Sequence, residues 1–467
     1  MKRTWIKSGT IVTASDIYVA DIWIEDGKIQ EIAKDLSHRA VEADDIFDAM
    51  GKYVFPGMID EHTHLESTFN FSETAPWRTE TVAAAYGGTT CVIDFSIQGK
   101  GETLHDALNT WKARASGSSA IDYGFHVAIS DMNASILEEI PKLVESGVPT
   151  LKLFMAYKNE LMINDSTLFL TLQKAKECGA LVMVHAENGD LVDALREQYM
   201  SRGNSEPYYH ALSRPVSVEA EATSRAIAIA ETANAPIFIV HVTAEESAEH
   251  IRTAKTKNLK VYGETCPHYL LLTVDCLKLP EFEGAKYVCS PPLRKAKDHD
   301  ALWHALGDHT IEAIGSDHCA FNFQGQKEMG RGDFRRIPNG GNGLEHRLTL
   351  LYTYGVKAGK LSLQRMVQLL STTPAKIHGL YPQKGTIAIG SDADLVIYEP
   401  RGTNKITHAT SHQGIDHDMF EGFEIEGGVE QVWLRGKKII SDGVYCGQLS
   451  DGTYTKRAPY GACYTGL

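Results

Sequence analysis

Eight short apolar runs alternate with amphipathic stretches through the middle of the chain, and this pattern limits the fold more than any other feature. The runs span residues 54–59, 91–95, 123–128, 151–154, 181–185, 237–241, 260–264 and 311–317. Helical periodicity is clearest at 104–115, 136–145, 166–178, 216–232 and 244–254. Strands that alternate with helices indicate βα units and a parallel sheet. Eight such units predict an α/β fold of the (β/α)8, or TIM-barrel, type.

An open, doubly wound sheet is the main alternative to a closed barrel. Residues of the metal-ligand type lie at the C-terminal ends of four different runs, at His62 and His64, His185, His241 and Asp317. Barrel enzymes build their sites from the carboxyl ends of several strands. An open sheet instead uses a crevice at one switch point. The spread of these five residues therefore favours the barrel.

The two ends of the chain are rich in short strands and tight turns. This pattern of strands and turns covers residues 8–54 and occurs again at 385–390, 393–398 and 432–440. We expect the two ends to form one smaller β-sandwich domain. The predicted domains are therefore residues 1–54 with 383–467, which include a C-terminal tail, and the catalytic barrel of residues 55–382.

The composition and net charge of the chain limit the kinds of partner that it is expected to bind. The 467 residues are 43% hydrophobic and 23% charged, as in ordinary globular proteins, and carry a formal net charge of -14. Nucleic acid is not expected as a partner, because phosphate binding needs clustered Lys and Arg. No stretch has the length and apolarity of a signal peptide or a membrane span, so we expect a cytoplasmic protein without a membrane partner. The eight cysteines form no Cys-x-x-Cys pair.

A possible metal site begins at the pentad of residues 60–64. On a strand, His62 and His64 point to the same face, as two ligands of one metal ion would. Taken singly, each histidine at the end of an apolar run is equally compatible with a buried residue that bonds a backbone carbonyl. Together, four imidazoles at converging strand ends favour a metal. A bound cation also explains how Asp317 stays ionised there.

Lys152 is the unusual member of this set, because it lies within an apolar run. A buried ammonium group is costly unless it is paired or neutralised. The lysine side chain can face outward with a solvated head, act as a Schiff-base nucleophile, or react with carbon dioxide to give a carbamate that bridges two cations. The residue pattern alone leaves these alternatives open.

Motifs along nearly the whole chain resemble those of a known enzyme family. The matching stretches are 55–66, 151–158, 184–188, 209–215, 240–243, 264–270, 290–294, 316–319 and 337–340. In these stretches the chain is similar to the cyclic amidohydrolases of the dihydropyrimidinase and D-hydantoinase family.

The resemblance implies a two-zinc centre and a substrate site. It implies that one zinc ion is bound by His62, His64 and Asp317, and the other by His185 and His241. Lys152, N6-carboxylated, would bridge both ions. The substrate would be bound by Tyr157, Ser290 and Asn339. Asp317 and Tyr157 would be the catalytic residues. A homotetramer and a small cyclic amide or imide as substrate are also implied.

The implied reaction opens a cyclic amide or imide, such as a 5-substituted hydantoin or a dihydropyrimidine, to an N-carbamoyl amino acid. A hydroxide between the zinc ions would attack the ring carbonyl. The Tyr157 hydroxyl would stabilise the oxyanion. Asp317 would accept the hydroxide proton and deliver it to the leaving nitrogen.

The chain departs from the family pattern beside the first two histidines. It has Glu61 and Glu66 where the family often has valine and aspartate, and residues 67–71 differ from the expected hydrophobic gating loop. We therefore expect substrate choice to be set within residues 65–71. His268 and His318 are expected beside the ligands and not on the metal.

Three alternatives remain open. A dihydroorotase or allantoinase would use similar metals, although a dihydroorotase usually has an arginine soon after the His-x-His, where this chain has Leu65 and Glu66. A mononuclear deaminase would need only three of the histidines with Asp317, and it leaves Lys152 without a role. A non-catalytic assembly protein of the same fold would have no reason to keep all six candidate ligands.

Overall fold

The predicted barrel is present in the computed structural model, which describes residues 2–69 and 72–462. Its eight parallel strands follow one another around the sheet in chain order. They are β6 (Met58–Thr63), β9 (Thr89–Ile97), β10 (Asp122–Ala128), β11 (Thr150–Phe154), β12 (Leu181–His185), β13 (Ile237–Ile239), β14 (Val261–Thr265) and β15 (Ala313–Ile314). Consecutive parallel pairing of this kind is the arrangement of a (β/α)8 barrel.

The barrel is closed between its last and first strands by the segment that follows β15. The backbone N–H of His318 donates to the carbonyl of His62 (3.3 Å), and that of His64 donates to the carbonyl of His318 (2.8 Å). These bonds bring Asp317 next to the first two histidines. The same backbone hydrogen bonds therefore close the sheet and bring the candidate ligands of its first and last strands together.

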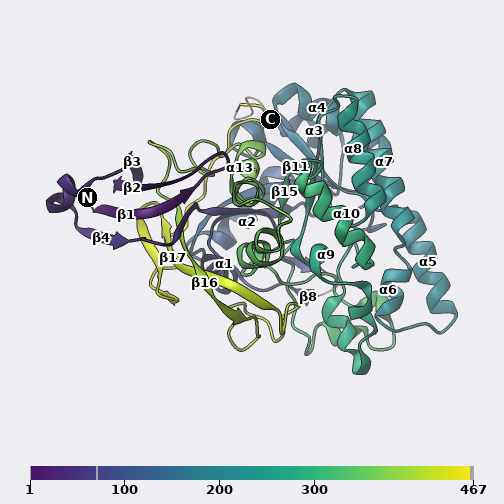
Figure 1. The fold of residues 1–467 in the computed structure, drawn as a ribbon. Coiled ribbons are helices and arrows are strands. Elements are labelled where there is room, and N and C mark those ends of the chain that lie inside the picture. Colours follow the sequence, from purple (N-terminus) through teal and green to yellow (C-terminus); the bar gives the residue numbers. More distant parts are fainter. Residues whose placement is uncertain (1, 70–71, 463–467) are drawn as a thin grey trace.

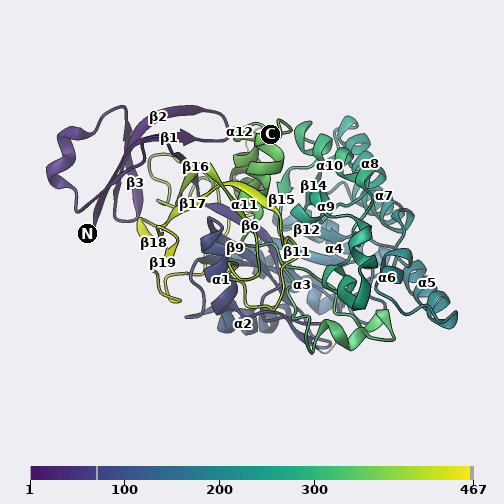
Figure 2. The same cartoon turned by 60° about the horizontal axis from the view of Figure 1, so that its bottom comes forward.

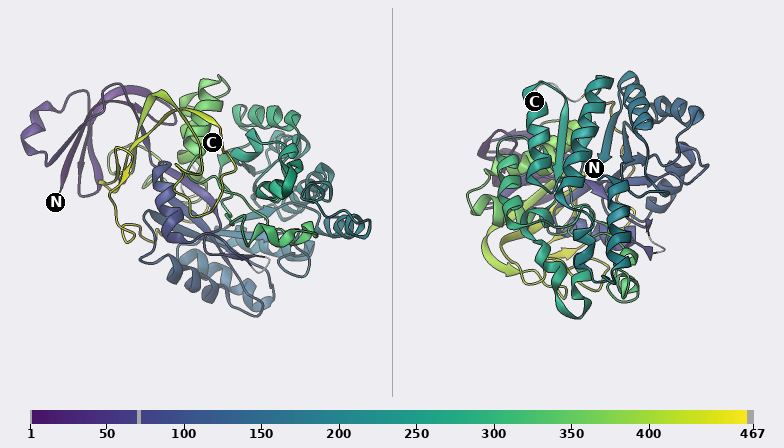
Figure 3. Two further views of the ribbon diagram at one scale, coloured as in Figure 1. Left: turned by 90° about the horizontal axis from the view of Figure 1, so that it is seen from below. Right: turned by 90° about the vertical axis from the view of Figure 1, so that its right-hand side faces the viewer.

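Helices cover the barrel on the side away from the terminal sheet, as the right-hand view of Figure 3 shows. The predicted helical stretches correspond closely to α2 (Leu104–Ala115), α3 (Ala134–Glu145), α4 (Asp165–Cys178), α7 (Val216–Ala233) and α8 (Glu245–Thr256). The other α-helices are α1 (Trp77–Tyr86), α5 (Gly189–Ser201), α6 (Tyr208–Leu212), α9 (Pro267–Leu271), α10 (Ala296–Gly307), α11 (Arg347–Leu351), α12 (Leu363–Val367) and α13 (Thr373–Ile377). None of the helices in the described part of the chain combines the length and apolarity needed to cross a bilayer.

The two ends of the chain form the predicted second module, which projects from the barrel at the left of Figures 1 and 2. It is one nine-stranded, mostly antiparallel sheet with the order β19-β18-β17-β16-β5-β1-β2-β3, and β4 pairs with β1. Its strands are β1 (Arg3–Val12), β2 (Ile17–Glu25), β3 (Lys28–Ala33), β4 (Asp45–Asp48), β5 (Tyr53–Pro56), β16 (Leu395–Lys405), β17 (Glu424–Leu434), β18 (Lys437–Ser441) and β19 (Val444–Tyr445). A separate hydrophobic core supports this sheet.

The prediction of residues 54–59 as one barrel strand is wrong. The run divides at Gly57 into β5, which pairs with β1 and β16 in the terminal sheet, and β6, which begins the barrel. The N–H of Gly57 donates to the carbonyl of Asp394 (2.8 Å), and a side chain at Gly57 would collide with Thr90. Apolar continuity in the sequence hides this change of sheet, because both halves are buried.

The C-terminal tail crosses the end of the barrel opposite the candidate site. Backbone bonds join its residues 453–460 to positions 123, 147, 179 and 379. The buried guanidinium of Arg457 donates to the carbonyl of Phe125 and to the hydroxyl of Thr150. The tail tyrosines Tyr454 and Tyr460 contact Phe125 and the barrel strand β14 of their own chain. Tyr464 lies outside the described residues.

Candidate metal centre

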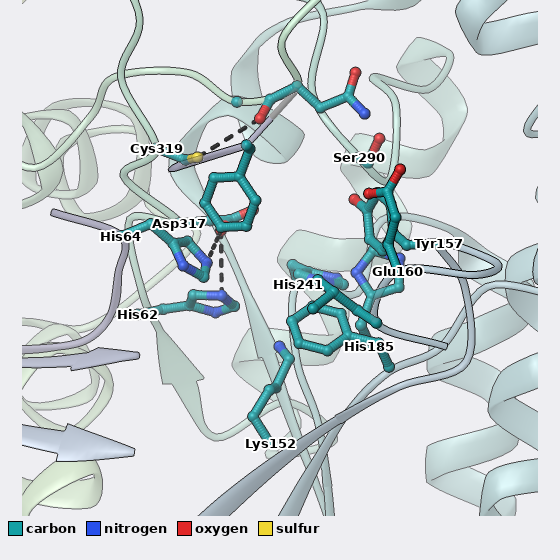
Figure 4. Close-up of a pocket in the computed structure, with 15 residues that line it drawn as sticks. His62, His64, Lys152, Tyr157, Glu160, His185, His241, Ser290, Asp317 and Cys319 are labelled. Carbon is teal, nitrogen blue, oxygen red and sulfur yellow. Dashed lines mark hydrogen bonds and ion pairs between the residues drawn. The ribbon is translucent and has the colours of Figure 1, made fainter. Parts of the chain in front are cut away.

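Every predicted site residue lines one cavity at the carboxyl ends of the barrel strands. Figure 4 shows His62, His64 and Asp317 on one side, His185, His241 and Tyr157 on the other, Ser290 above and Lys152 below. The remaining lining residues are Phe69, Phe154, Glu160, Leu161, Cys319, Asn339 and Gly340.

One carboxylate oxygen of Asp317 faces both imidazoles of the first strand. Its Oδ1 lies 3.2 Å from Nε2 of His62 and 3.5 Å from Nε2 of His64. Burial would raise the pKa of Asp317, but the adjacent His62 and His64 outweigh it and hold the pKa well below its usual value. Candidate ligand atoms of these three residues all lie within 4.8 Å of one another. These three side chains are therefore close enough together to bind one cation.

His185, the last residue of β12, belongs to the second pair of candidate ligands, and a buried ion pair orients its ring. Nε2 of His185 lies 2.8 Å from Oε2 of Glu187, and the same carboxylate is paired with the guanidinium of Arg214. The rings of His185 and His241 are 4.5 Å apart between centroids. His241 lies just beyond β13 with a φ of +40°, a left-handed conformation that is unusual for a non-glycine residue and costs backbone strain.

Lys152 extends from β11 into the cavity and is almost completely buried. Burial lowers the pKa of its amine to about 8, although the carboxylates of Glu264 and Asp317 oppose the shift. This position excludes the outward-facing alternative. A lowered pKa leaves more of the amine unprotonated at neutral pH, and only the unprotonated amine reacts with carbon dioxide.

The substrate side of the cavity combines a phenol with two chain segments. The backbone of Tyr157 is left-handed with a φ of +66°, and its ring lies 5.2 Å from that of His185. Burial raises the pKa of the Tyr157 hydroxyl, so the hydroxyl keeps its proton and can donate it in a hydrogen bond. Ser290 and Asn339 lie on separate segments that meet at the same cavity.

Two residues that contact the candidate ligands were not predicted to have roles. Glu264 and Glu187 bond the candidate ligands directly, and both follow apolar runs in the sequence, which was the available signal. His318 is paired with Glu80 (2.8 Å), so its side chain points away from the ligands as expected. His268 is buried, and its ring does not line the cavity.

The expected specificity segment is described only in part. Leu65 is buried and the Glu66 carboxylate accepts a hydrogen bond from the backbone N–H of Trp77 (3.2 Å). Phe69 ends the short strand β7 (Thr68–Phe69), which pairs with β8 (Ser72–Glu73), and it reaches the cavity. Asn70 and Phe71 lie outside the described residues.

A second cluster of carboxylates surrounds the ammonium group of a lysine. Carboxylates of Asp122, Asp392 and Asp394 lie close enough together to bind a cation. The ammonium of the buried Lys384 sits among them at 2.6, 3.1 and 2.7 Å, respectively. This cluster is therefore a salt-bridge network between the barrel and the terminal sheet.

The donor set at the cavity fits a metal centre. Imidazole and carboxylate donors together suit zinc and similar divalent ions. Nδ1 of His64 and of His241 are buried and lack a hydrogen-bond partner among the described residues. Uncompensated buried polar atoms at a ligand cluster indicate that a further group belongs there.

A (β/α)8 barrel with histidines, a buried lysine and an aspartate at the carboxyl ends of its strands has the architecture of a barrel hydrolase with candidate metal ligands. The profile of the Amidohydrolase family matches residues 53–439, and the chain belongs to this family.

Individual relatives match over nearly the whole length. A D-hydantoinase of Ralstonia pickettii is 50% identical over 97% of this chain and 99% of its own. The crystal structure of a dihydropyrimidinase from Brevibacillus agri is 48% identical, with a TM-score of 0.97 over 98% of this chain and 99% of that one. An L-hydantoinase (dihydropyrimidinase) from Arthrobacter aurescens is 31% identical, with a TM-score of 0.89 over 98% and 100% of the two chains.

Proposed function

We propose that the protein hydrolyses cyclic amides and imides, namely 5-substituted hydantoins and dihydropyrimidines, to N-carbamoyl amino acids. The observation that carries this proposal is the convergence of all six candidate ligands on the cavity that also contains Tyr157, Ser290 and Asn339. The names of the relatives, which are hydantoinases and a dihydropyrimidinase, support the same substrate class.

The proposed cofactors are two zinc ions. His62, His64 and Asp317 would hold one ion, His185 and His241 the other, and Lys152 would bridge both as an N6-carboxylated lysine. When bound, the pair of ions would lower the pKa of a water molecule from 15.7 to roughly 7 and so supply hydroxide near neutral pH. The homotetramer remains a proposal that rests on the family resemblance, and the cytoplasmic location remains a proposal that rests on the sequence alone.

The protein's own groups would position the ring and move the protons. The protonated Tyr157 hydroxyl would donate a hydrogen bond to the carbonyl oxygen as negative charge develops on it. Asp317 would take the proton of the attacking group and pass it to the leaving ring nitrogen. The Asp317 carboxylate is ionised before the reaction, as a group that accepts a proton must be. Ser290 and Asn339 would hold the amide or imide of the ring.

The cavity disfavours the dihydroorotase alternative. Among its described lining residues, the basic side chains are the four histidines and Lys152, and none is an arginine. A ring that carries a carboxylate is usually held by an arginine through two parallel hydrogen bonds. Neutral rings therefore fit this cavity better than dihydroorotate.

Metal analysis combined with a substrate panel tests the proposal. The panel holds both enantiomers of a 5-substituted hydantoin, dihydrouracil, allantoin and dihydroorotate. We expect two zinc ions per chain and hydrolysis of the first two substrate types. A protein that binds no zinc and opens none of these rings would instead be a scaffold, and preferred hydrolysis of allantoin or dihydroorotate would reassign the substrate.

A further inference from the structure

Lys327 is a buried lysine that the proposed chemistry does not use. It starts a short 3₁₀ turn (Lys327–Gly330), and its side chain is completely buried. No carboxylate of the described residues forms an ion pair with it. Its ammonium instead donates to three backbone carbonyls, those of Val288 (3.0 Å), Pro338 (3.1 Å) and Gly340 (2.7 Å). All three donors of the ammonium are thereby satisfied.

These three carbonyls belong to the two segments that reach the substrate side of the cavity. Val288 lies two residues before Ser290, and Pro338 and Gly340 flank Asn339. The N–H of Gly340 also donates to the carbonyl of Val288 (3.0 Å), which joins the segments directly. Lys327 therefore binds both segments from the side away from the cavity, without lining the cavity itself.

The bonding pattern also fixes which way Asn339 faces. The carbonyls on either side of Asn339 point to Lys327, whereas its own carbonyl accepts a bond from Sγ of Cys319 (3.6 Å), a cavity residue. The backbone of Gly340 has a φ of +147°, and a side chain there would collide with the carbonyl of Cys319. The segment can therefore shift little while Lys327 holds the flanking carbonyls.

We propose that Lys327 is a positioning residue that holds residues 288–290 and 338–340 together and so presents Ser290 and Asn339 to the ring amide. This inference rests on the proposed function. A buried ammonium without a counter-ion costs folding free energy, which three backbone carbonyls only partly offset. A methionine of similar length would fill the same space at lower cost, so the charge points to a role in holding the segments.

The matched variants are Lys327→Met and Lys384→Met. Both remove a buried ammonium, but Lys384 lies in the network between barrel and terminal sheet, away from the cavity. We expect Lys327→Met to keep its metal content and to raise KM by at least about tenfold, the effect of one misplaced hydrogen bond, while kcat changes by less than about threefold. Lys384→Met should lower the stability and leave KM unchanged.

The wild-type protein offers a second measurement that needs no variant. Burial lowers the pKa of Lys327 to about 8, and a neutral amine has two N–H groups for three carbonyls. The titratable groups that face it do not titrate in this range: the pKa of Cys289 is raised to about 12, that of Cys319 is raised well above its usual value, and that of His417 is lowered to about 4. In the metal-loaded enzyme Lys152, whose free amine also has a pKa of about 8, would be carboxylated and so would not titrate as an amine. With a dihydropyrimidine substrate and this form of the enzyme, KM should rise between about pH 7 and pH 9.

Two outcomes would overturn the inference. One is an unchanged KM in folded, metal-loaded Lys327→Met. The other, decisive if that variant does not fold, is a wild-type KM that stays constant across the pH range. Failure of the proposed function looks different, because the metal-loaded wild type would then open none of the rings and no KM would be measurable.

Discussion

Nδ1 of His62 lies 2.9 Å from Oε2 of Glu264 and 3.0 Å from Oε1, with both side chains buried. This contact leaves Nε2 of His62 directed at Asp317. A carboxylate that accepts the outer N–H of a ligand histidine fixes the tautomer and orientation of the ring and makes it a better donor to the metal. Glu264 at the end of β14 thus supports a ligand from β6.

Glu264→Gln should weaken metal binding without removing a ligand. Loss of such a supporting carboxylate typically costs about 10- to 100-fold in metal affinity. Competition with a chelator of known affinity measures the change, with Glu312→Gln as a control at the amino end of β15. Affinity equal to that of the wild type would show that His62 is oriented without Glu264.

Lys152→Ala should lose both metal and activity, because it removes the proposed bridging ligand. Elemental analysis of the purified variant measures the metal content, and hydantoin hydrolysis measures the activity. Full zinc content in this variant would exclude a bridging role for Lys152.

Tyr157→Phe should lower kcat by about 10²- to 10³-fold, corresponding to about 2.7 to 4 kcal/mol for one oxyanion donor. The metal content should stay the same, because Tyr157 is not a proposed ligand. Steady-state kinetics on metal-loaded protein measure the effect. Tyr157 has no part in the chemistry if kcat is unchanged.

Arg457→Met should lower the free energy of unfolding by about 3 kcal/mol, because it leaves buried acceptors without a donor. The guanidinium bonds the carbonyl of Phe125, the hydroxyl of Thr150 and the carbonyl of His378 (3.4 Å). Denaturant titration measures the loss, and Lys456→Met, at the exposed neighbouring residue, should change it little. Equal stability of the two variants would contradict a structural role for the tail.

His346 should contribute a pH-dependent part of the stability. Burial lowers its pKa, but the hydrogen bond to Asp418 (2.8 Å) and the Asp418 charge outweigh burial and raise the pKa above 6.5. The contribution is therefore fully present below pH 6.5 and is lost as the pH rises through the folded-state pKa. His346→Gln should cost more stability at pH 5.5 than at pH 8. A pH-independent cost would refute this reading.

The sequence predicted the barrel, the terminal module and the residues of the site because those features have strong local signals. Apolar runs followed by histidines identify strand ends, and α2 matches its predicted range residue for residue. The division at Gly57 was missed because two buried strands of different sheets follow each other without a polar break. Glu264 and Lys327 were also missed as partners, since their roles depend on contacts with residues far away in the chain.

The position of the tail affects how the protein can fold during synthesis. The barrel strands leave the ribosome between residues 58 and 314, but β16 to β19 and residues 453–460 follow only after all of them. Until then β5 lacks its partner β16, and the polar groups around Thr150 lack Arg457. Contacts between such distant parts of a chain form slowly. A nascent barrel therefore keeps an exposed base, and its folding can be completed only after residues 453–460 have been synthesised.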